Sequence, residues 1–171
     1  FSTGMHDPKS EKEFNLEKIR KIMEVNYFGT MNSINSVYSF YSDKKSGQIS
    51  IISSVAGYRG LPAAGAYCAS KSALTSFAES LHFEMRKKNV RISLISPGFI
   101  KTPMTDLNDF PMPMIKTPEF AAEQIYNGLI KKNNFEIHFP KAFTFIMKIL
   151  RILPNSVYFW LVEKGMKKIE Y

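Results

Sequence analysis

The sequence predicts an α/β protein built on a parallel sheet. Three observations lead to this expectation: an isoleucine-rich run at residues 48–53, a second apolar run at residues 90–96, and a helical pattern of about twenty residues between them. Parallel strands need a long crossover connection, and a helix is the usual one. The chain has 171 residues, 44% of them hydrophobic, which fits one globular unit with its own core.

The first expected element is helical and runs from residue 16 to residue 42. Apolar side chains recur there at helical spacing without any proline, among them Ile19, Ile22 and Phe28. The pattern predicts one long helix or two abutting ones. After the turn-like SDKKSG, the run QISIIS at residues 48–53 predicts a short buried strand.

The clearest helical pattern extends from Tyr67 to about Lys88. Its apolar positions are Leu74, Phe77, Ala78, Leu81 and Met85. VRISLIS at residues 90–96 predicts the second strand, which ends at Pro97-Gly98 because proline cannot donate to a sheet ladder.

Residues 99–117 hold three prolines and three methionines without a clear period, so we expect a loop or short helices over a cleft. PEFAAEQIYNGLIKK at 118–132 predicts a helix with Pro118 in its first turn, and FEIHF at 135–139 predicts a third strand.

Composition excludes some classes of function. The single cysteine, Cys68, cannot form an internal disulfide, which favours a reducing, cytoplasmic compartment. His6, His82 and His138 lack metal-ligand spacing and are expected to be structural or surface residues without partners, and no metal is expected. The net charge of +8 attracts anions, but without a recognised module or aromatic platform we expect no nucleic-acid binding.

Three polar residues form the candidate site. Tyr67 and Lys71 are four positions apart, so they share one face of the predicted helix. Ser54 comes just after the 48–53 strand, at the sheet edge where α/β proteins gather their active sites. An ammonium close to a phenol is expected to lower the phenol pKa from its usual value near 10. A serine hydroxyl can stabilise charge that develops on a carbonyl oxygen.

Four segments together resemble the classical branch of the short-chain dehydrogenase/reductase family, from the start of the chain to about residue 140. They are VNYFG at 25–29, ISSVAG at 52–57, YCASK at 67–71 and SPGFIKTP at 96–103. The resemblance implies the C-terminal part of a Rossmann-type doubly wound parallel sheet. It also implies that Ser54, Tyr67 and Lys71 are the catalytic triad, with Asn26 as a fourth member that holds a water linking Lys71 to solvent.

The same resemblance implies a nicotinamide cofactor, NAD or NADP. The expected cofactor-binding residues are Tyr67, Lys71, Pro97, Gly98, Ile100 and Thr102. Lys71 would grip the ribose, Gly98 would let the backbone pass close to the nicotinamide, and Thr102 would bind the carboxamide. Other interpretations stay open: Ser54 as a turn residue, Asn26 as a helix interruption, and Thr102 as a cap before Pro103.

A dinucleotide site also needs a glycine-rich turn between a strand and a helix. No two of the nine glycines are separated by a single residue, and Thr3-Gly4 has neither a strand before it nor glycines after it. We therefore expect this chain to be the catalytic half of a longer protein, without the N-terminal strands and the turn. The residue that selects NAD or NADP would lie in that other half.

The chain divides into a catalytic part at 1–140 and an apolar, basic helical tail at 141–171. The tail has six basic and two acidic residues, and Lys148, Arg151 and Pro154-Asn155 interrupt its apolar runs, so it cannot span a bilayer. Two interpretations remain. Residues 141–168 lie on a membrane surface with Phe159 and Trp160 as anchors, or they cover the substrate cleft or a subunit contact.

The leading functional hypothesis is an NAD(P)-dependent oxidoreductase that acts on a small apolar carbonyl or alcohol, lipid-like or steroid-like. An adaptable apolar lid is expected from loop residues, namely Phe99, Met104, Phe110, Met112 and Met114. One alternative is a catalytically silent, membrane-associated scaffold of the same fold. Another is an epimerase or dehydratase of the extended branch. The resemblance implies a homodimer or homotetramer for the full-length protein.

Overall fold

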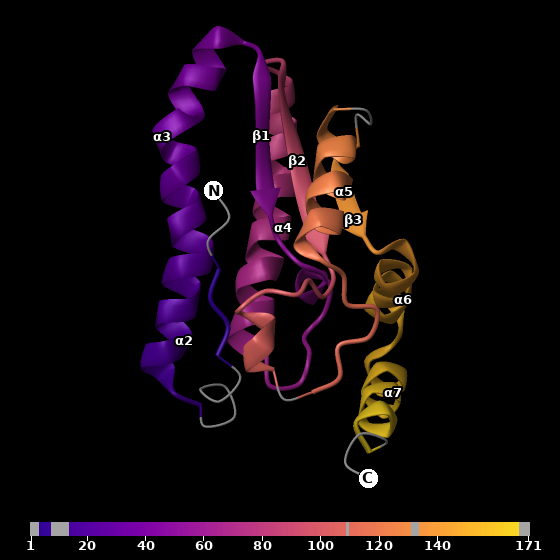
Figure 1. Ribbon diagram of the computed structural model, residues 1–171. Helices are drawn as coiled ribbons and strands as arrows, with labels where there is room; N and C mark the ends of the chain where they lie inside the picture. Colours follow the sequence, from indigo (N-terminus) through magenta and orange to yellow (C-terminus); the bar gives the residue numbers. More distant parts are fainter. Residues whose placement is uncertain (1–3, 8–13, 109, 131–133, 168–171) are drawn as a thin grey trace.

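The computed structural model describes residues 4–7, 14–108, 110–130 and 134–167 (Figure 1). Its sheet has three parallel strands in the order β1-β2-β3: β1 at Gly47–Ile52, β2 at Val90–Pro97 and β3 at Glu136–Phe139. Gly47 pairs with Val90 and Leu94 pairs with Glu136. All three strands predicted from the sequence are confirmed, and their carboxyl ends lie at the same edge of the sheet.

The N-terminal helical region is continuous but not uniform. Helix α2 (Leu16–Met23) passes into a π-helical segment, η1 (Glu24–Phe28), and then into α3 (Gly29–Lys44). The expectation of one long helix or two abutting helices is confirmed. The π-helical segment is an addition that the apolar spacing did not indicate. Such segments often occur at functional sites, and this one contains Asn26.

Helix α4 (Gly65–Arg86) makes the crossover between β1 and β2. Its apolar face includes Leu74, Ala78 and Met85, all fully buried, and packs against the same face of the sheet as Ile34 of α3. Truncating a leucine in such a core costs about 2–5 kcal/mol. This packing therefore fixes the position of the first turns of α4 relative to the carboxyl ends of the strands.

Helix α5 (Pro118–Ile130) covers the opposite face of the sheet. Neighbouring residues of β2 show this arrangement, because Leu94 packs in the α4 cluster while Ile95 packs with Ala121 of α5. The approach is close: a Cβ added to Gly128 would lie 2.7 Å from the side chain of Ile137. Helices on both faces confirm the doubly wound arrangement.

The segment between β2 and α5 is irregular, as expected. Its described residues include a 3-10 turn, η3 (Thr105–Leu107), and a bridge between Ile100 and Lys116. The predicted helix end at 131–132 lies outside the described residues, as do the chain termini at 1–3 and 168–171.

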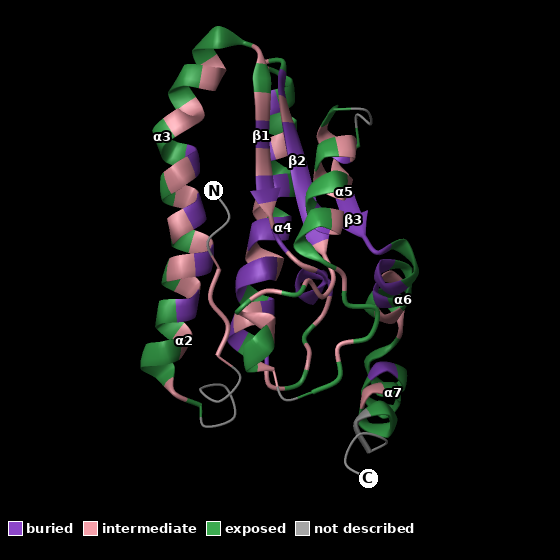
Figure 2. Ribbon diagram, in the orientation of Figure 1, coloured by how far each residue is buried: buried purple, intermediate pink, exposed green. Residues whose placement is uncertain are grey.

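The tail forms two helices, α6 (Lys141–Ile152) and α7 (Asn155–Lys167), beside the carboxyl end of β3 (Figure 1). Much of their surface is exposed (Figure 2). The exposed large apolar side chains there include Phe145, Ile149 and Trp160. In the described ranges, none of the helices has both the length and the apolar character needed to cross a bilayer.

Candidate active site

Ser54 stands between the end of β1 and a short 3-10 turn, η2 (Val55–Gly57). Its backbone is extended, with φ of −167°, and its Oγ accepts a hydrogen bond from the Ala56 N–H at 3.2 Å. Ser54 therefore has a turn-capping contact. The same hydroxyl lies on the wall of a cavity that also contains Tyr67, so the capping contact leaves Ser54 within the candidate site.

Helix α4 is held against η2 at the level of Lys71. The Ser53 Oγ donates to the Lys71 carbonyl at 2.9 Å, and the Ser72 Oγ donates to the Gly57 carbonyl at 3.0 Å. A Cβ on Gly57 would lie only 2.8 Å from the Lys71 carbonyl oxygen. Sequence reasoning did not single out Ser53 or Gly57, although both lie in the ISSVAG segment.

Lys71 is buried behind Tyr67. Lys71 is only 5% exposed, and its Nζ donates to the Ile52 carbonyl at 3.2 Å. The Nζ also lies 5.7 Å from the centroid of the Tyr67 ring. Burial lowers the pKa of Lys71 to about 8, because the surroundings disfavour its charged form.

The expected lowering of the Tyr67 pKa is wrong for this structure. Burial raises the pKa of the Tyr67 phenol, and a hydrogen bond from Ser54 acts in the opposite direction without overcoming it. The sequence shows the lysine four positions away. It does not show how far the surrounding side chains exclude water from the phenol.

Asn26 is fully buried and holds three parts of the chain together. Its Nδ2 donates to the Ser70 Oγ of α4 and to the Met5 carbonyl, each at 2.9 Å, and its Oδ1 accepts from the Met5 N–H at 2.7 Å. The Ser70 Oγ in turn donates to the Tyr67 carbonyl at 2.7 Å. Asn26 is therefore more than an interruption of its helix.

His6 is brought to the site by the same contacts. Its ring centroid lies 4.8 Å from that of Tyr67, and it lines the cavity. The expectation that the histidines lack partners is wrong for all three: His6 packs on Tyr67, His82 packs on Phe135, and His138 is hydrogen-bonded to Thr144. Residues 4–7 have no regular period, so the sequence carried no signal for this placement.

The cavity has a volume of about 610 Å³, within the usual range for ligand pockets. Its wall is mostly apolar and includes Leu61, Phe99, Met104, Phe110, Phe143 and Met147. Three of the five predicted lid residues, Phe99, Met104 and Phe110, are thus on the wall. Met112 and Met114 are not: Met114 is 46% exposed, and the Met112 sulfur accepts from Asn108. The residues of this stretch that do line the cavity are Pro111 and Pro113, the neighbours that alternate with the two methionines.

The predicted cofactor residues at the end of β2 fall into two groups. Pro97 and Gly98 lie beside Ser54, whose Oγ is 3.5 Å from the Pro97 carbonyl oxygen, and Gly98 lines the cavity. The Ile100 carbonyl and the Thr102 N–H both bond the Thr105 Oγ1, at 2.8 and 2.9 Å.

Gly98 has a close approach that the sequence did not predict. A Cβ there would lie 2.8 Å from the Phe143 ring of α6, so the glycine makes room for the tail.

As for metals, no group of three or more His, Cys, Asp or Glu side chains is placed to hold an ion in the described part of the chain.

A parallel sheet covered on both faces, with Ser54, Tyr67 and Lys71 at the carboxyl ends of its strands, defines a Rossmann-type α/β protein. The family model of short chain dehydrogenases matches residues 2–110, and the chain belongs to this family.

Among curated proteins, the chain is 32% identical over 157 residues to an uncharacterized oxidoreductase of Myxococcus xanthus, covering 92% of this chain and 62% of the relative. It is 34% identical over 162 residues to a dehydrogenase/reductase SDR family protein 7-like of Drosophila melanogaster, covering 88% of this chain and 49% of the relative. The chain thus spans about half to three fifths of the length of these relatives.

Solved structures show the same fold. A short chain dehydrogenase from Burkholderia cenocepacia in complex with NADP superposes with a TM-score of 0.73 at 26% identity, covering 86% of this chain and 60% of that one. A 4-hydroxyisoleucine dehydrogenase complexed with NADH and succinate superposes with a TM-score of 0.68 at 25% identity, covering 80% of this chain and 64% of that one.

Proposed function

We propose that the protein is an NAD(P)-dependent oxidoreductase that transfers hydride between nicotinamide and a small apolar carbonyl or alcohol. The observation that carries this proposal is the placement of Ser54 and Tyr67 together on the wall of an apolar cavity, with the Lys71 ammonium buried behind the phenol. Membership of the family, and the NADP and NADH bound to two structural neighbours, support it.

The residues present fit the nicotinamide end of such a cofactor. In the described structure one N–H of the Lys71 ammonium is taken by the Ile52 carbonyl, which leaves others able to donate to ribose hydroxyls. Tyr67 lies on the same side, and Pro97, Gly98, Ile100 and Thr102 follow at the end of β2 and just beyond it. The bound nicotinamide would supply or accept the hydride.

Tyr67 acts as the acid in the reductive direction. Its raised pKa keeps the phenol protonated at neutral pH, so it can donate its proton to the carbonyl oxygen. The Ser54 hydroxyl donates a hydrogen bond to the same oxygen and stabilises its developing charge. The Lys71 ammonium, largely charged below its pKa of about 8, stabilises the phenolate that remains.

Asn26 has a positioning role in this scheme. It ties Met5 to α4 through Ser70, the residue directly before Lys71, and thereby fixes the segment that carries His6. A Cβ on Gly4 would lie 3.8 Å from the Asn26 Oδ1 and 3.9 Å from the Lys71 Nζ. A water linking Lys71 to solvent, as the family resemblance implies, would pass near this point.

The substrate proposed is an apolar ketone or alcohol, because the cavity offers few polar groups beyond the reacting ones. Two further proposals concern the whole protein. The exposed apolar residues of α6 and α7 favour a peripheral contact with membranes, and the family resemblance favours a homodimer or homotetramer. The alternatives, a silent scaffold and an epimerase or dehydratase, remain outcomes of the experiment below.

The experiment follows hydride transfer by the full-length protein at the nicotinamide absorbance, with NADH and NADPH against apolar ketones and alcohols. Tyr67→Phe is expected to lower kcat by roughly 10²–10⁴-fold, the usual contribution of a positioned acid. Tyr126→Phe, on the exposed surface of α5, is the matched control. Cofactor binding without turnover of any substrate would favour the scaffold. Sugar nucleotides are added as a separate arm, and their conversion without net cofactor oxidation or reduction would favour the epimerase or dehydratase.

A further inference from the structure

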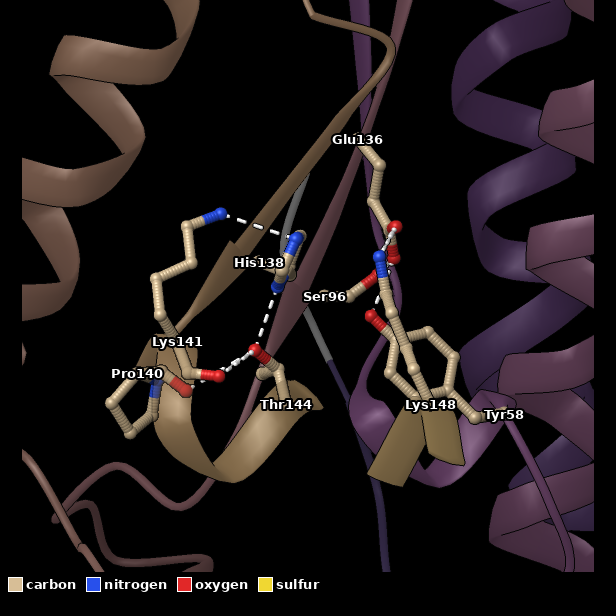
Figure 3. Close-up of polar contacts among 8 residues, drawn as sticks. All are labelled: Tyr58, Ser96, Glu136, His138, Pro140, Lys141, Thr144 and Lys148. Atoms are coloured by element: carbon tan, nitrogen blue, oxygen red, sulfur yellow. Dashed lines mark hydrogen bonds and ion pairs between the residues drawn. The ribbon is translucent and has the colours of Figure 1, made fainter. Parts of the chain in front are cut away.

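A network of polar side chains outside the candidate site joins four separate elements (Figure 3). The Glu136 carboxylate of β3 accepts three hydrogen bonds. Its Oε1 receives the Tyr58 hydroxyl at 2.5 Å and the Ser96 hydroxyl at 2.9 Å, and its Oε2 receives the Lys148 ammonium at 2.5 Å. Tyr58 follows η2, Ser96 lies on β2 and Lys148 lies on α6. One carboxylate thus links all four.

Two of the groups are deeply buried, since Ser96 is 0% and Tyr58 is 6% exposed. A carboxylate in such surroundings is costly unless its oxygens are hydrogen-bonded and its charge is paired. Hydrogen bonds to ions are also the stronger ones. Burial opposes ionisation of Glu136, but its bonds from Lys148, Tyr58 and Ser96 hold its pKa below the usual value. Glu136 is therefore ionised, and both of its carboxylate oxygens accept hydrogen bonds.

The position of this cluster relates it to the cavity. Tyr58 comes four residues after Ser54, and it packs with two residues of α6 that line the cavity, Phe143 and Met147. Lys148 follows Met147 directly in the chain. The Glu136–Lys148 pair thus holds the helix whose inner face forms one wall of the candidate substrate site.

Other contacts fix the two ends of α6. At its start, the Thr144 hydroxyl is 2.6 Å from the His138 Nδ1 of β3 (Figure 3). At its end, the Arg59 guanidinium donates to the carbonyls of Leu150 and Leu153 at 2.6 and 2.7 Å. Glu136 is bonded midway between them. Removing it would free the middle of α6 while both ends stay attached.

We infer that Glu136 is a positioning residue that fixes α6 as a wall of the cavity, through Lys148 and Tyr58, and thereby sets which apolar substrates fit. This inference rests on the proposed function for its substrate. Phe143 and Met147 carry the effect, because they are the α6 side chains that reach the cavity. Glu136 touches neither the cavity nor the reacting groups.

The experiment compares Glu136→Gln, Lys148→Met and the double variant in the full-length protein, with ketones of increasing chain length. The KM for long ketones is expected to rise at least about fivefold in each single variant, while kcat and the KM of the nicotinamide cofactor stay within about twofold. The double variant is expected to resemble the single ones, because both remove the same link. Lys164→Met, at an exposed lysine of α7, is the matched control.

A purely structural role predicts a different result. Loss of folded protein lowers the apparent kcat for every ketone and leaves the KM values unchanged, and this outcome would overturn the inference. An equal rise in KM for short and long ketones would also overturn the inference. A displaced α6 should affect only the ketones that are long enough to contact it.

A second measurement separates this inference from the proposed function. If the wild-type protein reduces no ketone, binding of the fluorescent dye 1-anilinonaphthalene-8-sulfonate is measured in place of turnover. The Met104→Trp variant, whose larger side chain fills the cavity, shows how much of the dye fluorescence comes from dye bound in the cavity. Weaker dye binding by Glu136→Gln, with Lys164→Met unchanged, would then support the positioning role although the proposed function had failed. Equal dye binding by both would reject it.

Discussion

The backbone of Gly57 lies directly against the backbone of Lys71. A Cβ at residue 57 would stand 2.8 Å from the Lys71 carbonyl oxygen and 3.0 Å from the Ser53 Oγ. This contact sets the distance between the turn after Ser54 and the helix that carries Tyr67 and Lys71. The two halves of the candidate site are therefore coupled at a point where no side chain fits.

Gly57→Ala is expected to destabilise the fold by about 1–3 kcal/mol, since the atom it meets is backbone and cannot move aside. It should also lower kcat, because the helix that carries Tyr67 and Lys71 is displaced from Ser54. Urea unfolding and turnover measure the two effects. Gly60→Ala is the matched control, because a Cβ at residue 60 meets nothing within 4 Å. Equal behaviour of the two variants would contradict the role given to this contact.

Lys71→Met is expected to remove activity and to stabilise the fold at neutral pH. The pKa of Lys71 is about 8 in the folded chain against an ordinary value of 10.5, so folding disfavours its charge. Wild-type stability should therefore rise between pH 8 and pH 10.5, where the unfolded chain binds more protons. The methionine variant lacks this dependence, and its advantage should be on the order of 1–3 kcal/mol at pH 7 and fade by pH 10.

Urea unfolding at pH 7 and pH 10 tests this expectation, with the exposed Lys164→Met as the control. If Lys71→Met were less stable than wild type at pH 7, the hydrogen bond from Lys71 to the Ile52 carbonyl would outweigh the cost of burying the lysine charge.

His6→Ala is expected to raise the KM for apolar substrates by roughly three- to tenfold, the effect of losing an aromatic contact of about 0.5–1.5 kcal/mol. The imidazole packs on Tyr67 and lines the cavity, so its loss removes substrate contact without removing the acid. Steady-state kinetics measure the change. His82→Ala is the control, since His82 packs on Phe135 at the other edge of the sheet. An unchanged KM would place His6 outside the substrate path.

Phe159→Ser with Trp160→Ser is expected to reduce binding to anionic vesicles by roughly tenfold or more, because burying each aromatic side chain in the interface contributes about 1.5–3 kcal/mol. Both residues are 56% exposed on α7, and Lys164 lies 4.9 Å from the Trp160 ring. Flotation with phosphatidylglycerol vesicles measures the change. Phe83→Ser, also exposed but on α4, is the control. Equal flotation of wild type and both variants would show that the tail does not bind the membrane through Phe159 and Trp160, and would leave its role in lining the cavity.

Short-range pattern was sufficient for much of the fold. The three strands and α4 were predictable because each is defined by its own periodicity, and α4 is the one connection long enough to cross between β1 and β2. The spacing of Ser54, Tyr67 and Lys71 also placed them correctly on one sheet edge, since all three belong to consecutive elements.

Contacts between distant segments were not predictable in this way. The approach of His6 to Tyr67 depends on the bonds between Asn26 and Met5, which join residues 21 positions apart. The bond of Glu136 to Tyr58 spans 78 positions. No local period records such contacts, because they arise only when several elements have packed.

By itself the sequence determined the order of the elements, the family and the three polar residues that stand at the ends of the strands. The tertiary structure alone decided how these residues ionise, because the pKa values of Tyr67 and Lys71 depend on burial by side chains from many elements. It also decided that the tail supplies a wall of the cavity, since that wall forms where Gly98, lacking a Cβ, admits the Phe143 ring.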